Sequence, residues 1–316
     1  MVKDLLILRH GHAKSKSTYG DFGRELKDKG KRNAQRMGVW LAENELQPDC
    51  VIASPAVRAK RTAEKCCKTA GLNARTIAFD DRLFDALPQT VLGIIQSCPP
   101  ETERLLIVGH NPSLSSLASM LSGEPCGLEP GCMAHLQITG DWGDLSPEAA
   151  KKVQLVSPEG LPDLFPYPDL AGEERRVRPA YYYSQSCVVP YRLKNDEVEV
   201  LIISSSKNKH WVVPKGIHDP GLSAQESAAN EALEEAGVEG VVHDTVLGQY
   251  AYAKWEATCE VTVYPMEVTR ELEPEEWEEN HRLRRWVLAD SAAQLINNAD
   301  LGEIIAGLAD YVSKKS

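Results

Sequence analysis

The stretch Asp4-Leu5-Leu6-Ile7-Leu8-Arg9-His10-Gly11 decides how the N-terminal half of the chain folds. Its four consecutive apolar residues predict a buried strand of a parallel sheet, because such strands are covered on both faces. Ligands of open α/β sheets bind at the carboxyl ends of the strands. We therefore expect Arg9 and His10 where the chemistry takes place, with Gly11 allowing a sharp backbone turn beside the imidazole.

Two later segments repeat this arrangement of an apolar run followed by polar residues. Residues 51–55 lead into a predicted helix that carries Arg58, and residues 105–110 end in His110. Arg24 follows the loop after the first strand. Guanidinium groups match phosphate oxygens, and a neutral imidazole attacks phosphorus. Two histidines and three arginines near strand ends therefore predict a phosphate pocket with a nucleophile.

Three strings in this half resemble the histidine phosphatase superfamily, and its short SixA-like phosphohistidine phosphatases in particular. They are Arg9-His10-Gly11, Ser54-Pro55 with Arg58 and Thr62-Ala63, and Gly109-His110-Asn111-Pro112. The resemblance implies an α/β/α doubly wound domain with His10 as nucleophile. It implies that Arg9, Arg24 and Arg58 hold the phosphoryl oxygens, with no cofactor. It also implies a protonated His110 that stabilises charge in the transition state.

The superfamily often adds a carboxylic acid that protonates the leaving group. Asp85, in the string Leu83-Phe84-Asp85-Ala86, is the candidate. The alternative is that Asp85 is only a solvated loop residue. SixA-like members resemble enzymes whose substrates carry good leaving groups. Such enzymes have less need of an acid that protonates the leaving group.

Length and composition bound the class of protein. A chain of 316 residues is too long for one ordinary core and favours two domains. No apolar run reaches the roughly 18 residues of a membrane span, and no signal-peptide pattern is visible, so we expect a cytoplasmic protein without a membrane partner. The eight scattered cysteines indicate reduced thiols. A net charge of -11 argues against nucleic acid but not against small anionic phosphorylated substrates.

The pattern of elements suggests where the domains divide. Residues 27–44 and 114–121 predict helices, and residues 133–138 predict a late strand. Beyond Gly140 the pattern decays and prolines punctuate the chain. We therefore expect a first domain over residues 1–160, a proline-rich linker over residues 161–176 and a second domain over residues 177–316.

The second half carries an acidic helix, predicted over residues 224–236 and ended by a glycine. Glu231, Glu234 and Glu235 stand at i, i+3 and i+4, so a regular helix places all three on one face. One interpretation is a solvated acidic face. The other is a site for Mg²⁺ or Mn²⁺, because mutual repulsion is relieved by a divalent cation and these cations prefer carboxylate oxygens.

The segment from Gly216 to Val238 resembles the signature of the Nudix hydrolases, Gly-x5-Glu-x7-Arg-Glu-U-x-Glu-Glu-x-Gly-U, where U is apolar. Leu222 replaces its first Glu, and Asn230 replaces its Arg. The resemblance covers residues 177–316 and implies an α/β/α Nudix sandwich with a mixed sheet. It implies Mg²⁺ or Mn²⁺ held by Glu231, Glu234, Glu235 and the carbonyl of Gly216, with Glu231 either a ligand or the base that orients water.

Further strings look like the diphosphoinositol polyphosphate and diadenosine polyphosphate hydrolases of that family. They are Ser204-Ser205-Ser206-Lys207, Trp211 through Gly216, and Glu276-Trp277-Glu278-Glu279 followed by Arg284-Arg285-Trp286. This resemblance implies that Ser206 and Lys207 bind phosphates. Lys215 is a second phosphate candidate, and Glu278 or Glu279 is a candidate for a further metal ligand or else a solvated charge.

These observations favour a two-domain phosphohydrolase. Its Nudix half would hydrolyse a phosphoanhydride of a nucleoside or inositol polyphosphate with Mg²⁺, and its N-terminal half would remove phosphate through a phosphohistidine intermediate. A second hypothesis is a phosphatase acting on a phosphohistidine protein, with a degenerate Nudix half as ligand sensor. Leu222 and Asn230 favour this second hypothesis, and the intact glutamates disfavour it. The complete phosphatase set disfavours a third hypothesis, a binding protein with two inactive sites.

Overall fold

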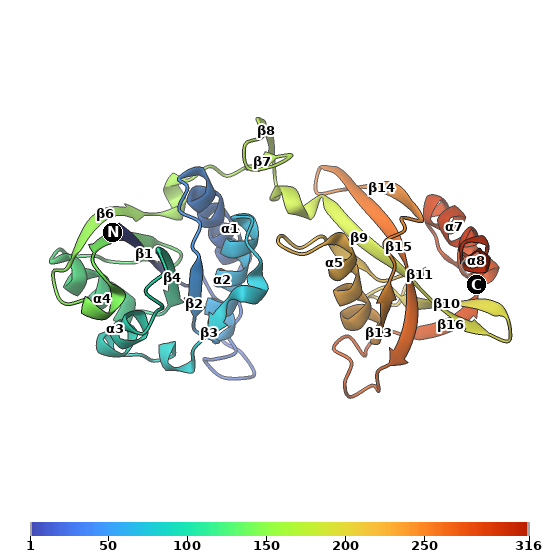
Figure 1. Cartoon of the computed structure of the whole chain (residues 1–316), viewed down its shortest axis with the longest axis horizontal. Coiled ribbons are helices and arrows are strands. Elements are labelled where there is room, and N and C mark those ends of the chain that lie inside the picture. The colour runs from blue at the N-terminus through green and yellow to red at the C-terminus, as the bar shows by residue number, and fades with distance from the viewer. Residues whose placement is uncertain (1, 315–316) are drawn as a thin grey trace. The chain divides into compact units, whose positions relative to one another are not determined.

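The computed structural model describes residues 2–314 and divides the chain into two compact units, Met1–Arg175 and Arg176–Ser316 (Figure 1). Each unit is a sheet with helices on both faces, as the sequence predicts. Within residues 2–314, no helix is both long enough and apolar enough to cross a membrane.

The first unit is built on a sheet of six strands in the order β3-β2-β4-β1-β5-β6. The strands are β1 (Val2–Arg9), β2 (Cys50–Ala53), β3 (Ala78–Phe79), β4 (Arg104–Gly109), β5 (Met133–Thr139) and β6 (Ala150–Val156). The first four are parallel to one another, whereas β5 runs antiparallel to both of its neighbours, β1 and β6. The register sets Arg9 beside Gly109 and Ala53 beside Val108. The residues that follow β1, β2 and β4 therefore meet at one edge of the sheet.

Helices cover both faces of this sheet (Figure 1). On one face lie α1 (Asp28–Glu43) and α2 (Val57–Thr69), and on the other lie α3 (Pro88–Gln96) and α4 (Ser113–Ser122). The helices predicted over residues 27–44 and 114–121, the predicted helix that carries Arg58, and the late strand are confirmed. On α1, the side chains of Met37, Trp40 and Leu41 face the sheet and are buried.

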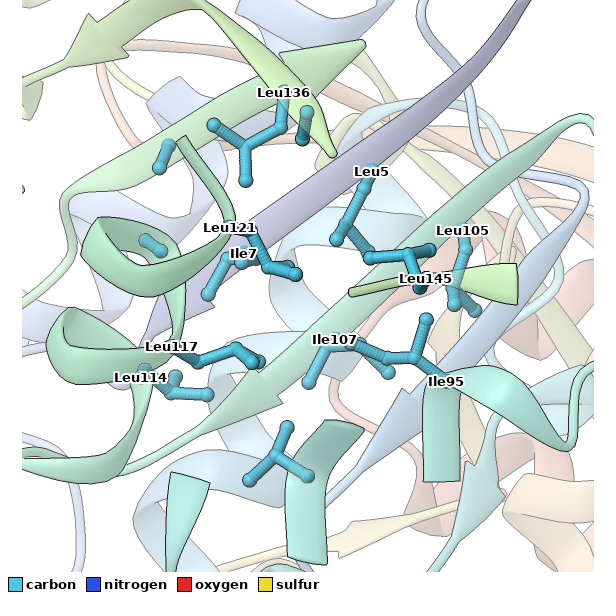
Figure 2. Close-up of a cluster of buried hydrophobic side chains, with 14 of the residues drawn as sticks. Leu5, Ile7, Ile95, Leu105, Ile107, Leu114, Leu117, Leu121, Leu136 and Leu145 are labelled. Atoms are coloured by element: carbon cyan, nitrogen blue, oxygen red, sulfur yellow. The ribbon is translucent and has the colours of Figure 1, made fainter. Parts of the chain in front are cut away.

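The apolar run of β1 supplies both cores. Leu5 and Ile7 enter one cluster, and Leu6 and Leu8 enter the cluster on the opposite face, because successive side chains of a strand alternate. Figure 2 shows the first cluster, where Leu5 and Ile7 meet side chains from β4 and α4. All four β1 side chains are fully buried, and each such burial contributes about 1.5–3 kcal/mol. This burial fixes the position of β1 and therefore of His10, which follows it.

The last part of the first unit contains structure that the sequence pattern does not predict. Residues 150–156 form the edge strand β6, whose side chains are mostly exposed and so give little hydrophobic signal. Residues 161–175, within the segment expected as a linker, belong to the first compact unit. Arg36 of α1 donates to the carbonyl of Pro162, and Phe165 is buried. Two short strands, β7 (Phe165–Tyr167) and β8 (Glu174–Arg176), pair with each other.

The second unit has a mixed sheet of eight strands, as the resemblance implies. The strands are β9 (Ser184–Lys194), β10 (Glu197–Ser204), β11 (Trp211–Val212), β12 (Lys215–Ile217), β13 (Val238–Val242), β14 (Gly248–Lys254), β15 (Ala257–Glu271) and β16 (Arg284–Leu288). β9 and β15 are parallel, and the other pairs are antiparallel. Asn195 and Asp196 join β9 to β10 with positive φ angles of 53° and 64°, as expected of a tight hairpin turn.

Two helical layers enclose this sheet (Figure 1). On one face, α6 (Ala289–Leu295), α7 (Ala299–Ala306) and α8 (Leu308–Ser313) cover a core that includes Cys187 and Val189. On the other face, α5 (Ala224–Glu231) covers Val188 and Leu201. The predicted helix over residues 224–236 is not regular throughout, because Ala232–Ala236 is a π-helical turn. It ends at Gly237, whose φ of 60° favours glycine.

Candidate active sites

His10 follows β1, and the backbone fixes its tautomer. Its Nδ1 lies 2.8 Å from the carbonyl oxygen of Gly11, so Nδ1 carries the proton and Nε2 keeps its lone pair. Burial lowers the pKa of His10 to about 4; the bond to Gly11 opposes this shift, and the charges of Arg58, Arg9 and Arg24 add to it. A neutral imidazole with an available nitrogen is the state that a nucleophile requires.

The turn after His10 depends on Gly11. A Cβ at Gly11 would lie 2.8 Å from the carbonyl oxygen of Gly30, closer than side chains tolerate. The Gly11 amide donates to Oγ1 of Thr62 over 3.0 Å, and that hydroxyl donates to the carbonyl of Arg58 over 2.7 Å. The first turn of the chain is thus joined to α2, which also carries Arg58.

The predicted arginines surround His10. Nε of Arg58 donates to Nε2 of His10 over 3.3 Å, and Arg58 is only 5% exposed. Arg9 donates from Nη1 to the carbonyl of Leu128 over 2.8 Å, while its buried Nε has no hydrogen-bond partner. Arg24 reaches the same place through Asp21, whose carboxylate binds the guanidinium groups of both Arg24 and Arg58. These residues bring positive charge close to one imidazole nitrogen, Nε2 of His10.

His110 completes the pocket from the end of β4. The centroids of the His10 and His110 rings are 5.1 Å apart, and Nε2 of His110 lies 2.9 Å from Oγ of Ser54. Burial, followed by the charge of Arg58, lowers the pKa of His110 to about 3. Burial thus favours the neutral form of His110 in the free protein, whereas the protonated form that the resemblance implies concerns the transition state with phosphate bound and stays a prediction. The neutral form is favoured because the ring is removed from water beside cationic arginines.

Asp85 does not stand out as an acid. It is exposed, with a φ of 51°, in the turn that follows Leu83. Its neighbour Phe84 makes the contact with the pocket, since the Phe84 ring meets the His110 ring edge-on at 5.6 Å between centroids. Phe22 packs edge-on against Phe84 in turn. The side of the pocket near His110 is therefore walled by aromatic rings.

Sequence reasoning missed three polar residues of this pocket, namely Asp21, Ser54 and Thr62. Ser54 and Thr62 lie inside the strings that carry the resemblance, which is the signal that points to them. The available signal for Asp21 is its spacing three residues before Arg24. None of these side chains has a chemistry that by itself predicts contact with a phosphate pocket.

In the second unit, Glu231 and Glu235 face the backbone that leads into α5. A Cβ at Gly216 would lie 1.8 Å from Oε1 of Glu231, so only glycine admits this carboxylate. The amide of Lys215 donates to Oε2 of Glu235 over 3.1 Å. Burial, followed by the charges of Glu235 and Glu234, raises the pKa of Glu231 to about 8. The carboxyl groups of Glu231 and Glu235 thus converge on the backbone of residues 215–216, at the start of β12.

Glu234 does not share this face. It is exposed, whereas Glu231 and Glu235 are partly buried. The reason is the π-helical turn, which is wider than an α-helical turn and rotates the residues after Glu231. The carbonyl of Glu234 accepts from Nε1 of Trp277 and from the amide of Glu279, which holds the turn in place.

Arg282 is a residue of this site that the sequence reasoning missed. It is 8% exposed and forms ion pairs of 2.5 Å with both Glu235 and Glu279. Its Nη1 also donates to the carbonyl of Ser204, at the start of the loop expected to bind phosphate. Arg282 therefore links the acidic cluster to that loop.

The phosphate-binding candidates lie in two places. Ser206 and Lys207 are exposed in the turn between β10 and β11, which the Ser205 amide closes by donating to the His210 carbonyl. Lys215 is partly buried on β12. Its ammonium donates to Oε1 of Gln185 over 3.2 Å and to the hydroxyl of Tyr252 over 3.0 Å.

The oxygen atoms of Glu231, Glu235 and Gly216 suit a hard divalent cation whose other ligands are water and substrate phosphate. Among residues 2–314, no three His, Cys, Asp or Glu side chains converge as a preformed metal cage. Mg²⁺, however, is usually bound through one or two carboxylates together with water and substrate phosphates. Glu231, Glu235 and the Gly216 carbonyl fit that pattern, and the close approach of Glu231 to Gly216 is the supporting observation.

Comparison with known proteins divides the chain into the same two parts as the structure does. The sequence model of the histidine phosphatase superfamily (branch 1) matches residues 5–86, and that of the NUDIX domain matches residues 184–308. An uncharacterised protein of Mycobacterium tuberculosis is 31% identical over 162 residues, 48% of this chain and 99% of that protein. Nudix hydrolase 17, mitochondrial, of Arabidopsis thaliana is 38% identical over 135 residues, 40% of this chain and 72% of that protein.

Among solved structures, the protein histidine phosphatase SixA complexed with tungstate is similar, with a TM-score of 0.44 and 22% identity, over 49% of this chain and 97% of that one. Both units are of hydrolase families, and the chain is a two-domain phosphohydrolase. Its N-terminal unit belongs to the histidine phosphatase superfamily, and its C-terminal unit belongs to the Nudix hydrolases.

Proposed function

We propose that the N-terminal unit hydrolyses a terminal phosphoryl group through a phosphohistidine at His10, without a metal. The observation that carries this proposal is the hydrogen bond between Nδ1 of His10 and the Gly11 carbonyl, which leaves Nε2 facing Arg58. Nε2 forms a bond to phosphorus while the bond to the leaving group breaks, and water then releases phosphate from His10.

The chain's own residues account for the other parts of that reaction. Arg9, Arg24 and Arg58 would bind the non-bridging oxygens and neutralise the charge that develops on them. A bound phosphoryl dianion would raise the pKa of His110, which would then donate to the phosphoryl oxygens. Asp85 remains the candidate acid for the leaving group.

The test is to trap the intermediate. Rapid acid-free denaturation during turnover of phenyl phosphate should give a protein-bound, acid-labile phosphate in the parent and none in His10→Ala. His10→Ala should lose several orders of magnitude of phosphatase rate, as nucleophile removal typically does. His243→Ala is the matched control, because it removes a partly buried histidine of the other compact unit. Phosphatase activity retained in His10→Ala would show that the nucleophile lies elsewhere.

For the C-terminal unit, we propose hydrolysis of a phosphoanhydride in a small nucleoside or inositol polyphosphate. Glu231, Glu235 and the Gly216 carbonyl would hold Mg²⁺ or Mn²⁺, which supplies charge neutralisation and acidifies a bound water. Ser206, Lys207 and Lys215 would bind the phosphate chain. Glu231 is either a ligand or the base that orients water. Support comes from the convergence of two carboxylates at a glycine that admits no side chain.

Two observations favour the second hypothesis, a phosphohistidine protein phosphatase whose Nudix unit senses a ligand. Arg282 already neutralises Glu235, and the signature positions at Leu222 and Asn230 are changed. A catalytic cation would then have fewer carboxylate oxygens available as ligands. Release of phosphate from diadenosine tetraphosphate with and without Mg²⁺ separates the two hypotheses, since a sensor would bind this compound without cleaving it.

A further inference from the structure

We propose that Asp21 is a positioning residue of the phosphatase pocket: its carboxylate holds the arginine donors in the free protein and is displaced by the phosphoryl group. The inference rests on the proposed function of that pocket. It differs from an acid–base role, because the hydrogen bond from Arg24 lowers the pKa of Asp21 and keeps it an anion.

Each of the three nitrogens of Arg58 makes one hydrogen bond. Nη1 donates to the carbonyl of Asp21 over 2.6 Å, and Nη2 donates to Oδ2 of Asp21 over 2.8 Å. The third nitrogen, Nε, donates to Nε2 of His10. A guanidinium is a rigid planar fork whose donors have fixed directions. A phosphoryl group that accepts the Nη2 hydrogen now bound to Oδ2 of Asp21 must therefore displace that carboxylate.

Arg24 is engaged in the same way by the other carboxylate oxygen. Its Nη1 donates to Oδ1 of Asp21 over 2.7 Å, and its Nε donates to the carbonyl of Lys14 over 2.6 Å. Asp21 thus gives one oxygen to each guanidinium, as two non-bridging phosphoryl oxygens would. The carboxylate is the anion that these two arginines share in the free protein.

Asp21 can leave without disturbing the core. Its side chain is 54% exposed, whereas that of Arg58 is 6% exposed. Asp21 lies in an exposed loop closed by the backbone bridge between Ala13 and Leu26. The buried arginine would remain in position while the exposed carboxylate moves into solvent. The free protein thereby keeps Arg58 aligned with His10 at the expense of some phosphate affinity.

The experiment measures inorganic phosphate binding by titration calorimetry in the full-length protein, with EDTA present. Asp21→Asn keeps the shape of the side chain and removes its charge. It should bind phosphate roughly three- to tenfold more tightly, because it competes less well for the guanidinium groups. KM for phenyl phosphate should fall in parallel, while kcat falls as well because the arginines are less well aligned. A purely structural role would not tighten phosphate binding.

Asp28→Asn is the matched control, since Asp28 is another exposed aspartate paired with a cation, Lys31, outside the pocket. It corrects for the general effect of removing one negative charge. If thermal melting shows that Asp21→Asn is unfolded, Asp21→Ser removes the same carboxylate and takes its place. Phosphate binding that is unchanged or weaker in the folded variant, relative to Asp28→Asn, would overturn the inference. Failure to trap a phosphoenzyme would overturn the proposed function but not this binding result.

Discussion

The two sites of this chain handle the charge of phosphate with opposite sets of residues. The pocket at His10 brings together Arg9, Arg24 and Arg58, so the protein itself supplies the positive charge. The site at Gly216 presents two carboxyl groups, Glu231 and Glu235, and no positive charge comes from them, so a cation would have to supply it. From this difference we infer that the first proposed reaction draws its positive charge from side chains, whereas the second would draw it from a bound cation.

The largest effect that separates the sites is expected from Glu231→Gln. Cleavage of diadenosine tetraphosphate should fall about 10²–10⁴-fold, because a ligand or general base is lost. Phosphatase activity on phenyl phosphate should be unchanged, since Glu231 belongs to the other compact unit. Glu234→Gln should cost much less, because Glu234 is exposed. Equal losses in the two variants would contradict the assignment of ligands by burial.

Ser54→Ala should lower the phosphatase activity by a smaller factor. It removes the contact between Oγ and Nε2 of His110, a hydrogen bond worth about 1 kcal/mol, so kcat/KM should fall about fivefold. Ser97→Ala is the control, because Ser97 is an exposed serine that bonds only to its own helix at Gly93. Equal kinetics for the two variants would show that His110 needs no support from Ser54.

The pH dependence follows from the two histidines. Burial lowers the pKa of His10 to about 4 and that of His110 to about 3, from an ordinary value of 6.5. Between these values the unfolded chain binds more protons, so the free energy of unfolding should rise with pH up to about 6.5 and then level off. Each pKa unit corresponds to about 1.4 kcal/mol. Thermal melts should show a shallower rise in His110→Asn, and an identical profile would contradict the lowered pKa.

The smallest effect concerns the two changed positions of the Nudix signature. In the family, these positions look like an ion pair, and both partners are absent here because Leu222 and Asn230 replace them. Leu222→Glu or Asn230→Arg alone should destabilise the second unit more than the double change does. A thermal double-mutant cycle measures this coupling, and an interaction below about 0.5 kcal/mol would mean that the positions do not meet.

Much of the first site could be predicted because it follows strong periodic signals. The buried runs before His10 and His110 define strands, and parallel strands place their carboxyl ends together. Charge states could not be predicted in the same way. The neutral form of His110 depends on burial beside Arg58, which no local pattern reveals.

The errors in the second half also have physical causes. A spacing of i, i+3 and i+4 places three glutamates on one face only if the helix is regular, and the π-helical turn after Glu231 removes Glu234 from that face. Arg282 lies 47 residues from Glu235 in sequence, so only the fold brings them together. In the first unit, the edge strand β6 could not be predicted because its side chains are largely solvent-exposed.

The most direct test of the central contrast is chelation of divalent cations in one sample of the full-length protein. Phosphate release from phenyl phosphate and cleavage of diadenosine tetraphosphate are measured before and after excess EDTA, and again after Mg²⁺ is restored. We expect phenyl phosphate hydrolysis to be unaffected. Cleavage of the dinucleotide should stop in EDTA and return with Mg²⁺. Loss of both activities in EDTA, or survival of both, would contradict the account of two sites with opposite charge.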